Sequence, residues 1–391
     1  MNNKKSTLNC PACKKKSQYL VDWEYSGLDD SIFNYTAKLC ECLSCGLVYI
    51  KNITDERLSI FYARECSYFE KSHFNISSPE NIEKYKYYRN TLVDIGLSNT
   101  KITDIGCGRG GFLKWLIDND WDADCVGVDV DIKSIPDAIE NKLNGSVNIS
   151  FKEGKAVALP FASDTQSLLT YFHVLEHICN IDQVLQEAFR VLNETGYILI
   201  EVPDAERYKD YPIGTAFWLS IREHIYHFSA TSLSHALFRN GFEVININRK
   251  ILPTPEFIYP SLMILARKNN KKNKQYLCET GDISSFIIQS KEELDAQAKG
   301  LLKLNKKYSN LTFWGISSEL FSLLPLLNFN FILCDSSKFK QQSHYKGIPI
   351  QSPETISKTG LLIIAPYLYG DAIETAAIEY GWEKEAILKL K

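Results

Sequence analysis

The 391-residue sequence lacks any apolar run that approaches the ~18 residues needed to span a bilayer, and its first residues lead into a polar segment instead of the apolar core of a signal peptide. It also lacks an excess of basic residues, since 44 Lys and Arg stand against 47 Asp and Glu and leave a net charge of -3. A nucleic-acid-binding surface usually needs such an excess. We therefore expect a cytoplasmic protein with a small-molecule partner, and neither a nucleic acid nor a membrane as partner.

The sequence does not have the regularly spaced cysteines of a disulfide framework. Of its 11 cysteines, five fall within the first 45 residues and six are scattered singly through the rest, often inside apolar runs. Scattered thiols are typical of proteins in a reducing compartment. The cysteine pattern therefore also favours the cytoplasm.

Two Cys-x-x-Cys pairs lie near the start of the chain, Cys10–Cys13 and Cys42–Cys45. Four thiolates on two tight turns make the tetrahedral ligand set of a structural zinc site, so a zinc ribbon held by Cys10, Cys13, Cys42 and Cys45 is predicted. Cys40 could take the place of Cys42 as a ligand. A redox Cys-x-x-Cys motif is the alternative interpretation, but such motifs usually adjoin a βαβ pattern, which this segment does not show.

Helical spacing of apolar and aromatic residues follows this segment, over 55–70. Its aromatic residues Tyr62, Tyr68 and Phe69 either join the core or cover the mouth of a ligand site. A second helix is predicted over 79–97, and it leads into the central part of the chain.

The central part of the chain alternates between predicted strands and helices. Strands are expected at 101–105, 124–130, 147–152, 167–172, 197–202, 242–248 and 261–266. Helices are expected between them, including 180–192 and 229–239, the second capped by Ser229 or Thr231. This alternation predicts an α/β fold with a doubly wound, mainly parallel sheet whose ligand lies at the carboxyl ends of the strands.

A helix predicted over 291–307 is followed by a second, shorter alternation. Its strands are expected at 311–316, 330–334, 361–365 and 386–390, and its helices at 318–327 and 371–380. This pattern predicts a smaller Rossmann-like unit, and the polar run 268–274 before it is predicted to be a linker or an exposed turn. The chain therefore divides into a zinc-ribbon domain at 1–75, a central domain at 76–268 and a C-terminal domain at 269–391.

The first central strand ends in a run of glycines that is typical of a nucleotide-binding turn. Gly106, Gly108 and Gly111 satisfy the dinucleotide fingerprint, and Asp129 follows at the end of the second strand, where a carboxylate can bind ribose hydroxyls. This pattern alone fits both NAD and S-adenosylmethionine.

Two further residues favour S-adenosylmethionine. Asp104 stands two residues before the first glycine, where it can face a ligand ammonium group, and Gly110 completes an acid-x-Gly-x-Gly-x-Gly pattern. A carboxylate at this place would repel a pyrophosphate and attract a cationic amino-acid tail. The predicted cofactor is therefore S-adenosylmethionine.

At this point the sequence resembles the class I S-adenosylmethionine-dependent methyltransferases. The resemblance extends over about residues 80 to 268. It rests on the glycine-rich segment 101–113 (the cradle) and on the segments 158–161, 172–177, 190–196 and 201–204. It implies that the cofactor is bound by Asp104, Gly106, Gly108, Gly110, Asp129, Lys155, Ala156 and His173. Within this set Asp129 takes the ribose hydroxyls, and Lys155 and Ala156 flank the adenine. Because the family often has an acid where this sequence has Lys155, backbone groups are expected to recognise the adenine amino group.

Four of the seven histidines fall between residues 173 and 227. Glu176-His177 follows the fourth predicted central strand, and Glu223-His224 precedes the helix at 229–239. Both pairs should therefore reach the strand ends beside the cofactor. A structural role in the fold is the alternative for His224.

The three-part architecture resembles bacterial nucleotide-sugar C-methyltransferases and their relatives. In those enzymes a Tyr-His-Glu-His run supplies the base that removes a proton beside a sugar keto group. This chain keeps Glu223-His224 and has Ile221 and Arg222 in place of the first two residues. The resemblance implies that His224 is the base, that Glu223 orients it and that His177 holds or polarises a nucleotide-sugar acceptor. O- or N-methylation, or a non-catalytic scaffold that binds S-adenosylmethionine, are the alternatives.

Overall fold

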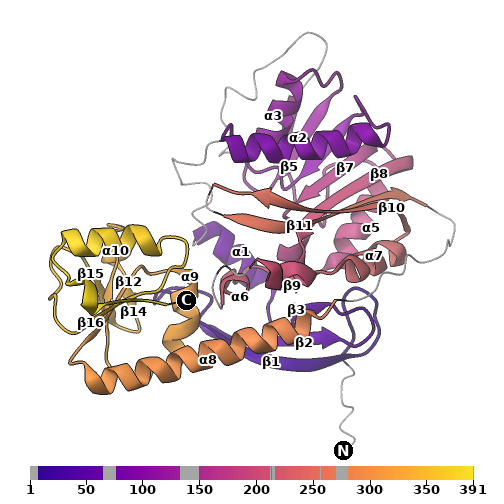
Figure 1. Cartoon of the computed structure of the whole chain (residues 1–391). Helices are drawn as coiled ribbons and strands as arrows, with labels where there is room; N and C mark the ends of the chain where they lie inside the picture. Colours follow the sequence, from indigo (N-terminus) through magenta and orange to yellow (C-terminus); the bar gives the residue numbers. More distant parts are fainter. Residues whose placement is uncertain are drawn as a thin grey trace, which may run out of the picture.

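The computed structural model describes residues 8–64, 76–132, 149–211, 213, 216–255, 257–269 and 281–390. Strands of these residues form three sheets, which belong to a ribbon, a central unit and a C-terminal unit (Figure 1). Tyr68, Phe69, the start of the strand predicted at 147–152 and most of the run 268–274 lie outside the described residues. None of the described helices combines the length and the apolar character that a membrane crossing requires.

The central sheet has seven strands in the order β10-β11-β8-β7-β4-β5-β6. They are β4 (Ile102–Ile105), β5 (Cys125–Asp129), β6 (Ile149–Glu153), β7 (Gln166–Phe172), β8 (Leu192–Pro203), β10 (Phe242–Pro253) and β11 (Ile258–Lys268). Strand β11 runs antiparallel to both β8 and β10, and the other pairs are parallel. The predicted doubly wound, mainly parallel sheet is thus confirmed, and β4 lies inside it, between β7 and β5.

Helices α2 (Pro79–Asp94), α3 (Gly111–Asp118), α5 (Ile181–Val191) and α7 (Ala230–Arg239) pack on this sheet. Helix α7 begins where predicted because Ser229 and Ser232 cap it reciprocally, with the Ser232 amide donating to the Ser229 Oγ at 3.0 Å. Its N-cap is therefore Ser229 and not Thr231. The helix fixes the end of the segment that carries Glu223 and His224.

The ribbon consists of the antiparallel strands β1 (Ser17–Tyr25), β2 (Tyr35–Cys42) and β3 (Val48–Ile50). Its fourth strand, β9 (Tyr226–His227), comes from the central part of the chain and pairs with β3. The ribbon and the central unit therefore share one sheet across the boundary predicted at residue 75. Helix α1 (Asp55–Arg64) follows the ribbon.

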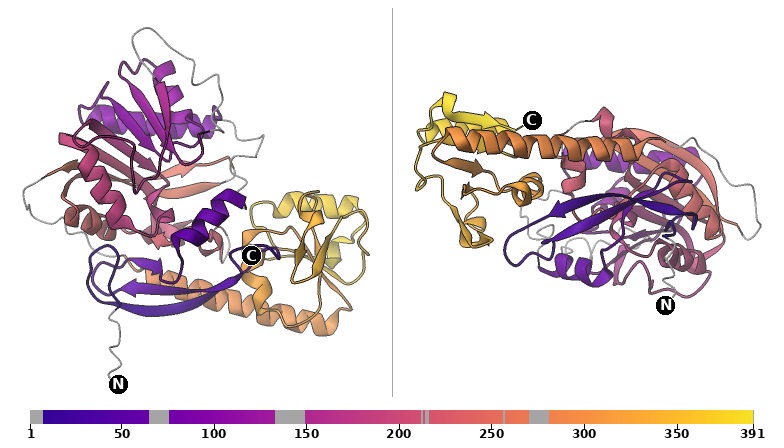
Figure 2. Two further views of the ribbon diagram at one scale, coloured as in Figure 1. Left: turned by 180° about the vertical axis from the view of Figure 1, so that it is seen from behind. Right: turned by 90° about the horizontal axis from the view of Figure 1, so that it is seen from below.

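The C-terminal unit begins with the long helix α8 (Ile283–Lys307), which starts earlier than the predicted 291–307. The helix packs against β1, and the Ser284 hydroxyl donates to Glu41 Oε1 at 2.7 Å. Figures 1 and 2 show α8 running along the ribbon from the central unit toward the C-terminal sheet. The predicted linker is thus followed by a helix that packs on the ribbon.

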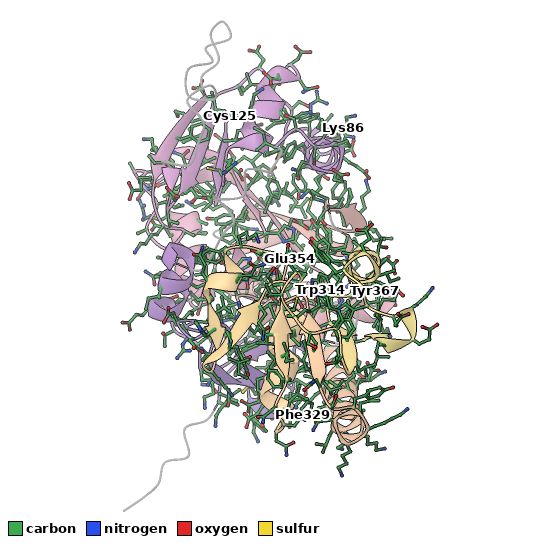
Figure 3. The ribbon with its side chains drawn as sticks, turned by 90° about the vertical axis from the view of Figure 1, so that its left-hand side faces the viewer. Lys86, Cys125, Trp314, Phe329, Glu354 and Tyr367 are labelled. Carbon is green, nitrogen blue, oxygen red and sulfur yellow. The ribbon has the colours of Figure 1, made fainter. Side chains whose placement is uncertain are left out.

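The C-terminal sheet has the order β14-β15-β13-β12-β16-β17. Its strands are β12 (Leu311–Trp314), β13 (Ile332–Cys334), β14 (His344–Tyr345), β15 (Ile348–Gln351), β16 (Leu361–Ile364) and β17 (Ile387–Lys389). Only β14 pairs antiparallel, so the smaller Rossmann-like unit is confirmed, although the β14–β15 hairpin was not predicted. Trp314, Glu354 and Tyr367 lie at the carboxyl end of this sheet and Phe329 at the other (Figure 3).

Helices α9 (Ser318–Leu323) and α10 (Gly370–Glu379) complete the C-terminal unit. Helix α9 contacts both β1 of the ribbon and α6 (Phe217–Ser220) of the central unit. The Ser26 hydroxyl donates to the Phe321 carbonyl at 2.6 Å, and the Tyr25 hydroxyl donates to the Leu219 carbonyl at 2.9 Å. The three units therefore meet at one junction, next to the segment that leads to His224.

Candidate functional site

The cradle lies at the carboxyl end of β4, between that strand and α3. Gly106, Gly108 and Gly110 have φ values of 72°, 52° and 70°, which L side chains rarely adopt. A Cβ on Gly106 would also lie 2.6 Å from Val174 Cγ2. Glycine is thus required here by backbone conformation and by space, and the turn leaves its backbone close to any ligand at the sheet edge.

Asp104 is the buried acid of this cradle, with 4% of its surface exposed. The Thr170 hydroxyl on the neighbouring β7 donates to its Oδ1 at 2.6 Å. Burial raises the pKa of the Asp104 carboxyl to about 7, and the charge of Asp129 adds to this effect, while the hydrogen bond from Thr170 opposes it. A ligand cation beside Asp104 would restore its charged form.

Asp129 ends β5 and ties the glycine turn to that strand. The Gly108 amide donates to its Oδ2 at 2.9 Å and the Asp131 amide donates to its Oδ1 at 3.0 Å. Burial raises the pKa of Asp129, and these backbone donors oppose the shift. Each carboxylate oxygen keeps a lone pair beyond these bonds, so Asp129 can still accept hydrogen bonds from two hydroxyls.

Lys155 and Ala156 follow β6, on the side of the cradle where the resemblance expects the adenine. The side chain of Lys155 is exposed and Ala156 is half-buried. The Ala158 amide donates to the Lys155 carbonyl at 2.9 Å and closes a tight turn. On this side the chain therefore offers a short turn of backbone beside an exposed lysine.

His173 follows β7 with an unusual φ of 57°. Its Nδ1 lies 3.0 Å from Glu176 Oε1, and its Nε2 lies 2.8 Å from the Tyr259 hydroxyl and 3.0 Å from Glu201 Oε2. Burial opposes a charge on the ring, but the two carboxylates outweigh it and raise the pKa of His173 to about 10. Both ring nitrogens have partners in the protein, so the ring serves a buried polar network.

That network includes residues that the sequence did not single out. Glu201 is fully buried in β8, and it accepts hydrogen bonds from the hydroxyls of Tyr88 at 3.3 Å and Tyr259 at 3.2 Å. A carboxylate within the apolar run of β8 was the available sign, since a buried acid needs partners. The network fixes the loop after β7, which carries Glu176 and His177.

The two predicted Glu-His pairs come together in the structure. The rings of His177 and His224 lie 4.7 Å apart at 75°, and His177 Nδ1 donates to the Glu223 carbonyl at 3.2 Å. Glu176 lies beside them, fully buried, and its carbonyl accepts a hydrogen bond from the Ile225 amide at 2.8 Å. Burial first, and then the neighbouring histidines, hold the pKa of His224 well below its usual range.

Tyr62 of α1 packs edge-on against His177, with ring centroids 6.3 Å apart. The helix α1 thus reaches the histidine pair, and Tyr62 also packs against the hydrophobic core. The His177 imidazole is also only partly buried, which leaves part of the ring open to an incoming molecule.

Arg222 occupies the position at which the nucleotide-sugar C-methyltransferases have a histidine. Its side chain makes contacts within the fold instead. Its guanidinium carbon lies 4.7 Å from the ring centre of Phe33 and 5.5 Å from that of Phe321, and Nη1 donates to the Ser26 carbonyl at 2.7 Å. Arg222 thus joins the ribbon and the C-terminal unit to the segment that carries His224.

The four predicted zinc ligands also come together. Their sulfur atoms lie within 4.8 Å of one another, with 3.6 Å between Cys10 and Cys45 and 3.3 Å between Cys13 and Cys42. The amides of Ser44 and Cys45 point to Cys42 Sγ at 3.4 and 3.5 Å, an arrangement that stabilises a thiolate. Cys40 Sγ instead faces the Lys38 carbonyl at 4.0 Å, so the geometry selects Cys42.

Part of the chain is similar in sequence to known methyltransferases. Residues 80–247 match a family model described as a methyltransferase domain. An uncharacterized methyltransferase, YcgJ of Bacillus subtilis, is 28% identical over 101 residues, which are 26% of this chain and 39% of the relative. A ubiquinone biosynthesis O-methyltransferase of Azorhizobium caulinodans is 29% identical over 104 residues, or 27% and 40% of the two chains. The matched region thus spans about two fifths of these curated relatives.

Among solved structures, a S-adenosylmethionine-dependent methyltransferase from Methanosarcina mazei has 20% identity and a TM-score of 0.40. The match covers 46% of this chain and 98% of that one. Residues 80–247 are thus similar to a methyltransferase domain, and the strand order of the central unit is that of the class I methyltransferase fold.

Proposed function

We propose that the protein transfers a methyl group from S-adenosylmethionine to a small acceptor, and that the acceptor is a nucleotide-linked sugar or a related metabolite. The cradle carries this proposal. It combines a buried acid, three glycines with positive φ and a carboxylate at the end of the next strand, all at the carboxyl edge of one parallel sheet.

Each part of the cofactor would contact residues whose chemistry suits it. The Asp104 carboxylate faces the ammonium of the methionine tail, the backbone of Gly106, Gly108 and Gly110 lets that tail approach, and Asp129 accepts from the ribose hydroxyls. The turn at Lys155 and Ala156, closed by the hydrogen bond from the Ala158 amide, would flank the adenine. Bound in this way, S-adenosylmethionine supplies a methyl group on a positive sulfur, and the protein has to align an acceptor behind it.

Glu176, His177 and His224 mark the acceptor site in this proposal. For C-methylation, His224 would take the proton from the carbon next to a keto group, and the enolate left on the acceptor would be the nucleophile that the methyl donor requires. His177, whose ring centroid lies 4.7 Å from that of His224, would hold the acceptor beside this base. Glu223 helps through its carbonyl, which orients the His177 ring.

O- or N-methylation is the second candidate, and the substitution at Arg222 favours it. The side chain that replaces the family's histidine is engaged with Phe33 and Phe321, so it does not supply the same group to an acceptor. An oxygen or nitrogen nucleophile needs less help from a base than a carbon does. A scaffold that binds the cofactor without turnover is the remaining alternative.

We further propose that Cys10, Cys13, Cys42 and Cys45 hold a structural Zn²⁺. Four thiolates in this arrangement fit the tetrahedral geometry that zinc prefers. The ribbon is fastened to α7, because Ser229 Oγ donates to the Cys45 carbonyl at 3.3 Å and Arg239 donates to the Ala12 carbonyl at 2.9 Å. Zinc would thus support the segment that carries His224. Such a protein belongs in the reducing cytoplasm, where its thiols stay available to the metal.

Calorimetry with S-adenosylmethionine tests the cradle. Wild-type protein is expected to bind one cofactor per chain, and Asp104→Asn at least ~10-fold more weakly, because the amide loses the charge that faces the ammonium. Asp122→Asn, an exposed carboxylate in the same domain, is the matched control and should bind as wild type. Equal binding by Asp104→Asn and wild type would remove the cofactor assignment.

A further inference from the structure

Glu176, His177 and His224 bring one carboxylate oxygen and two imidazole nitrogens together within 4.8 Å of one another. Glu176 Oε1 and His177 Nε2 are 3.8 Å apart, too far for a hydrogen bond. Donors bound to one ion at ~2.0–2.2 Å lie ~3–4 Å from each other. The three side chains can therefore close on a single cation with shifts of about an ångström.

Two atoms of this cluster are buried without a partner. Among the described residues, neither Glu176 Oε2 nor His224 Nδ1 has a hydrogen-bond partner. Glu176 is 0% exposed and His224 is 8% exposed. Buried polar atoms are nearly always satisfied, and an unsatisfied one costs ~1–3 kcal/mol. Two such atoms in one cluster indicate that a ligand belongs between these side chains.

The surroundings of the cluster orient its donors. The Glu223 carbonyl can only accept, so the hydrogen bond at 3.2 Å puts the proton on His177 Nδ1 and leaves a lone pair on Nε2. The other oxygen of Glu176, Oε1, is held by His173 at 3.0 Å. Metal-binding histidines and carboxylates are typically held by such outer partners, which fix the ring tautomer and the direction of the carboxylate.

We propose that Glu176, His177 and His224 bind a divalent transition-metal ion and leave its remaining coordination positions to oxygen atoms of the acceptor. Two nitrogens and one oxygen suit Mn²⁺, Fe²⁺, Co²⁺ or Zn²⁺ better than Mg²⁺ or Ca²⁺, which prefer oxygen donors alone. This ion is separate from the zinc of the four cysteines. An acceptor with two neighbouring oxygens, such as a hydroxy-ketone or a vicinal diol, could chelate it.

The inference deepens the proposed methyl transfer and changes the role of one residue in it. A bound cation would polarise the acceptor oxygen and lower the pKa of the group that must ionise, whose proton would pass to solvent water. His224 would then hold the ion, and the activation assigned above to its imidazole would pass to the cation. The two roles exclude each other, so a measurement of metal binding separates them.

Titration with Mn²⁺, followed by the loss of the free-ion signal in electron paramagnetic resonance, is the direct test. Mn²⁺ favours oxygen and nitrogen over thiolates, so zinc-loaded full-length protein reports only the new site. Wild type is expected to bind one Mn²⁺ per chain, and Glu176→Gln and His177→Gln at least ~10-fold more weakly. His235→Gln changes a histidine on α7 outside the cluster and should bind as wild type.

Absence of Mn²⁺ binding to wild type, or equal binding by both cluster variants, would overturn the inference. Because Glu176 is fully buried, the half-buried His177→Gln variant carries the test if Glu176→Gln unfolds. Methyl transfer with and without added Mn²⁺ distinguishes the two proposals. Methyl transfer by a protein that binds no metal would rule out the metal site and leave the proposed methyl transfer standing. Metal binding without transfer to any acceptor would rule out the methyl transfer and leave the metal site standing.

Discussion

The guanidinium of Arg222 lies over the ring of Phe33, with its central carbon 4.7 Å from the ring centre. The same guanidinium also makes a cation–π contact with Phe321 of α9 and donates a hydrogen bond to the Ser26 carbonyl. Phe33 belongs to the ribbon, Phe321 to the C-terminal unit and Arg222 to the central unit. One side chain, two residues before His224, thus connects all three parts of the molecule.

We expect Arg222→Ala to lower the free energy of unfolding by about 1–3 kcal/mol, since it removes one hydrogen bond and two cation–π contacts. Arg222→Lys should recover only part of this, because an ammonium cannot stack as a planar guanidinium does. Methyl transfer should fall along with stability. Chemical denaturation measures the effect, with Arg267→Ala, at a half-exposed ion pair with Glu243, as control. Equal stability of Arg222→Ala and Arg267→Ala would contradict the role of the junction.

Gly106→Ala should weaken the binding of S-adenosylmethionine by at least ~10-fold. The added methyl meets Val174 Cγ2 at 2.6 Å, and alanine at a φ of 72° is strained by ~1–2 kcal/mol. Gly300→Ala, where nothing lies within 4 Å of the new methyl, is the matched control and should bind normally. Calorimetry on both variants checks this, and unchanged affinity in Gly106→Ala would mean that the turn is not the cofactor cradle.

Binding of S-adenosylmethionine should depend on pH through Asp104. Its carboxyl has a pKa of about 7 and must lose its proton to pair with the ligand ammonium, so affinity should fall roughly tenfold per pH unit below that value. Above about pH 8 the ligand's own amino group loses its charge, so affinity should peak between these limits. The binding profile of Asp104→Asn should be flat below pH 7. A wild-type profile with the same flat shape would separate Asp104 from the ammonium.

The same raised pKa makes a prediction for the protein without cofactor. A carboxyl with a folded-state pKa above its unfolded value stabilises the fold when protonated, and this contribution is lost as the pH rises through about 7. The Tm should therefore decrease as the pH rises from about 4 to about 7 and level off above, and it should change less in Asp104→Asn. Thermal unfolding of both proteins over this range measures the difference.

Loss of zinc should affect the acceptor side more than the cofactor side. Cys13→Ser removes one of the four thiolates, and the ribbon would release β3, which pairs with β9 next to His224. We expect methyl transfer to fall more than the affinity for S-adenosylmethionine. Cys40→Ser, at a buried cysteine outside the ligand set, should keep both zinc and activity. Zinc content by mass spectrometry and activity assays on both variants decide this.

Local patterns in the sequence were sufficient for the cradle and the central sheet. Asp104 and the glycines belong to one strand end and its turn, and Asp129 ends the next strand, so their spacing could be recognised in the sequence alone. The expected convergence of His177 and His224 is observed, but strand order accounts only for His177, which follows β7, since His224 lies between α6 and the ribbon strand β9.

Features that depend on contacts between distant segments could not be predicted in this way. Strand β9 has two residues, and only its pairing with β3 makes it a strand. The buried partners of Glu201 come from α2 and β11, and the sequence shows only an acid inside an apolar run. In the sequence, Arg222 is recognisable only as a departure from a motif. The aromatic rings that it contacts belong to Phe33 and Phe321, which lie far away along the chain.

The central claim is methyl transfer itself, and deuterium-labelled S-adenosylmethionine tests it most directly. The labelled cofactor is incubated with wild type and with Asp104→Asn, together with a panel of nucleotide-linked keto sugars, and the products are analysed by mass spectrometry. Methyl transfer predicts one labelled methyl group on at least one acceptor with wild type, and strongly reduced labelling with Asp104→Asn. Binding of the cofactor by wild type without label on any acceptor or related metabolite would contradict it and favour a non-catalytic scaffold.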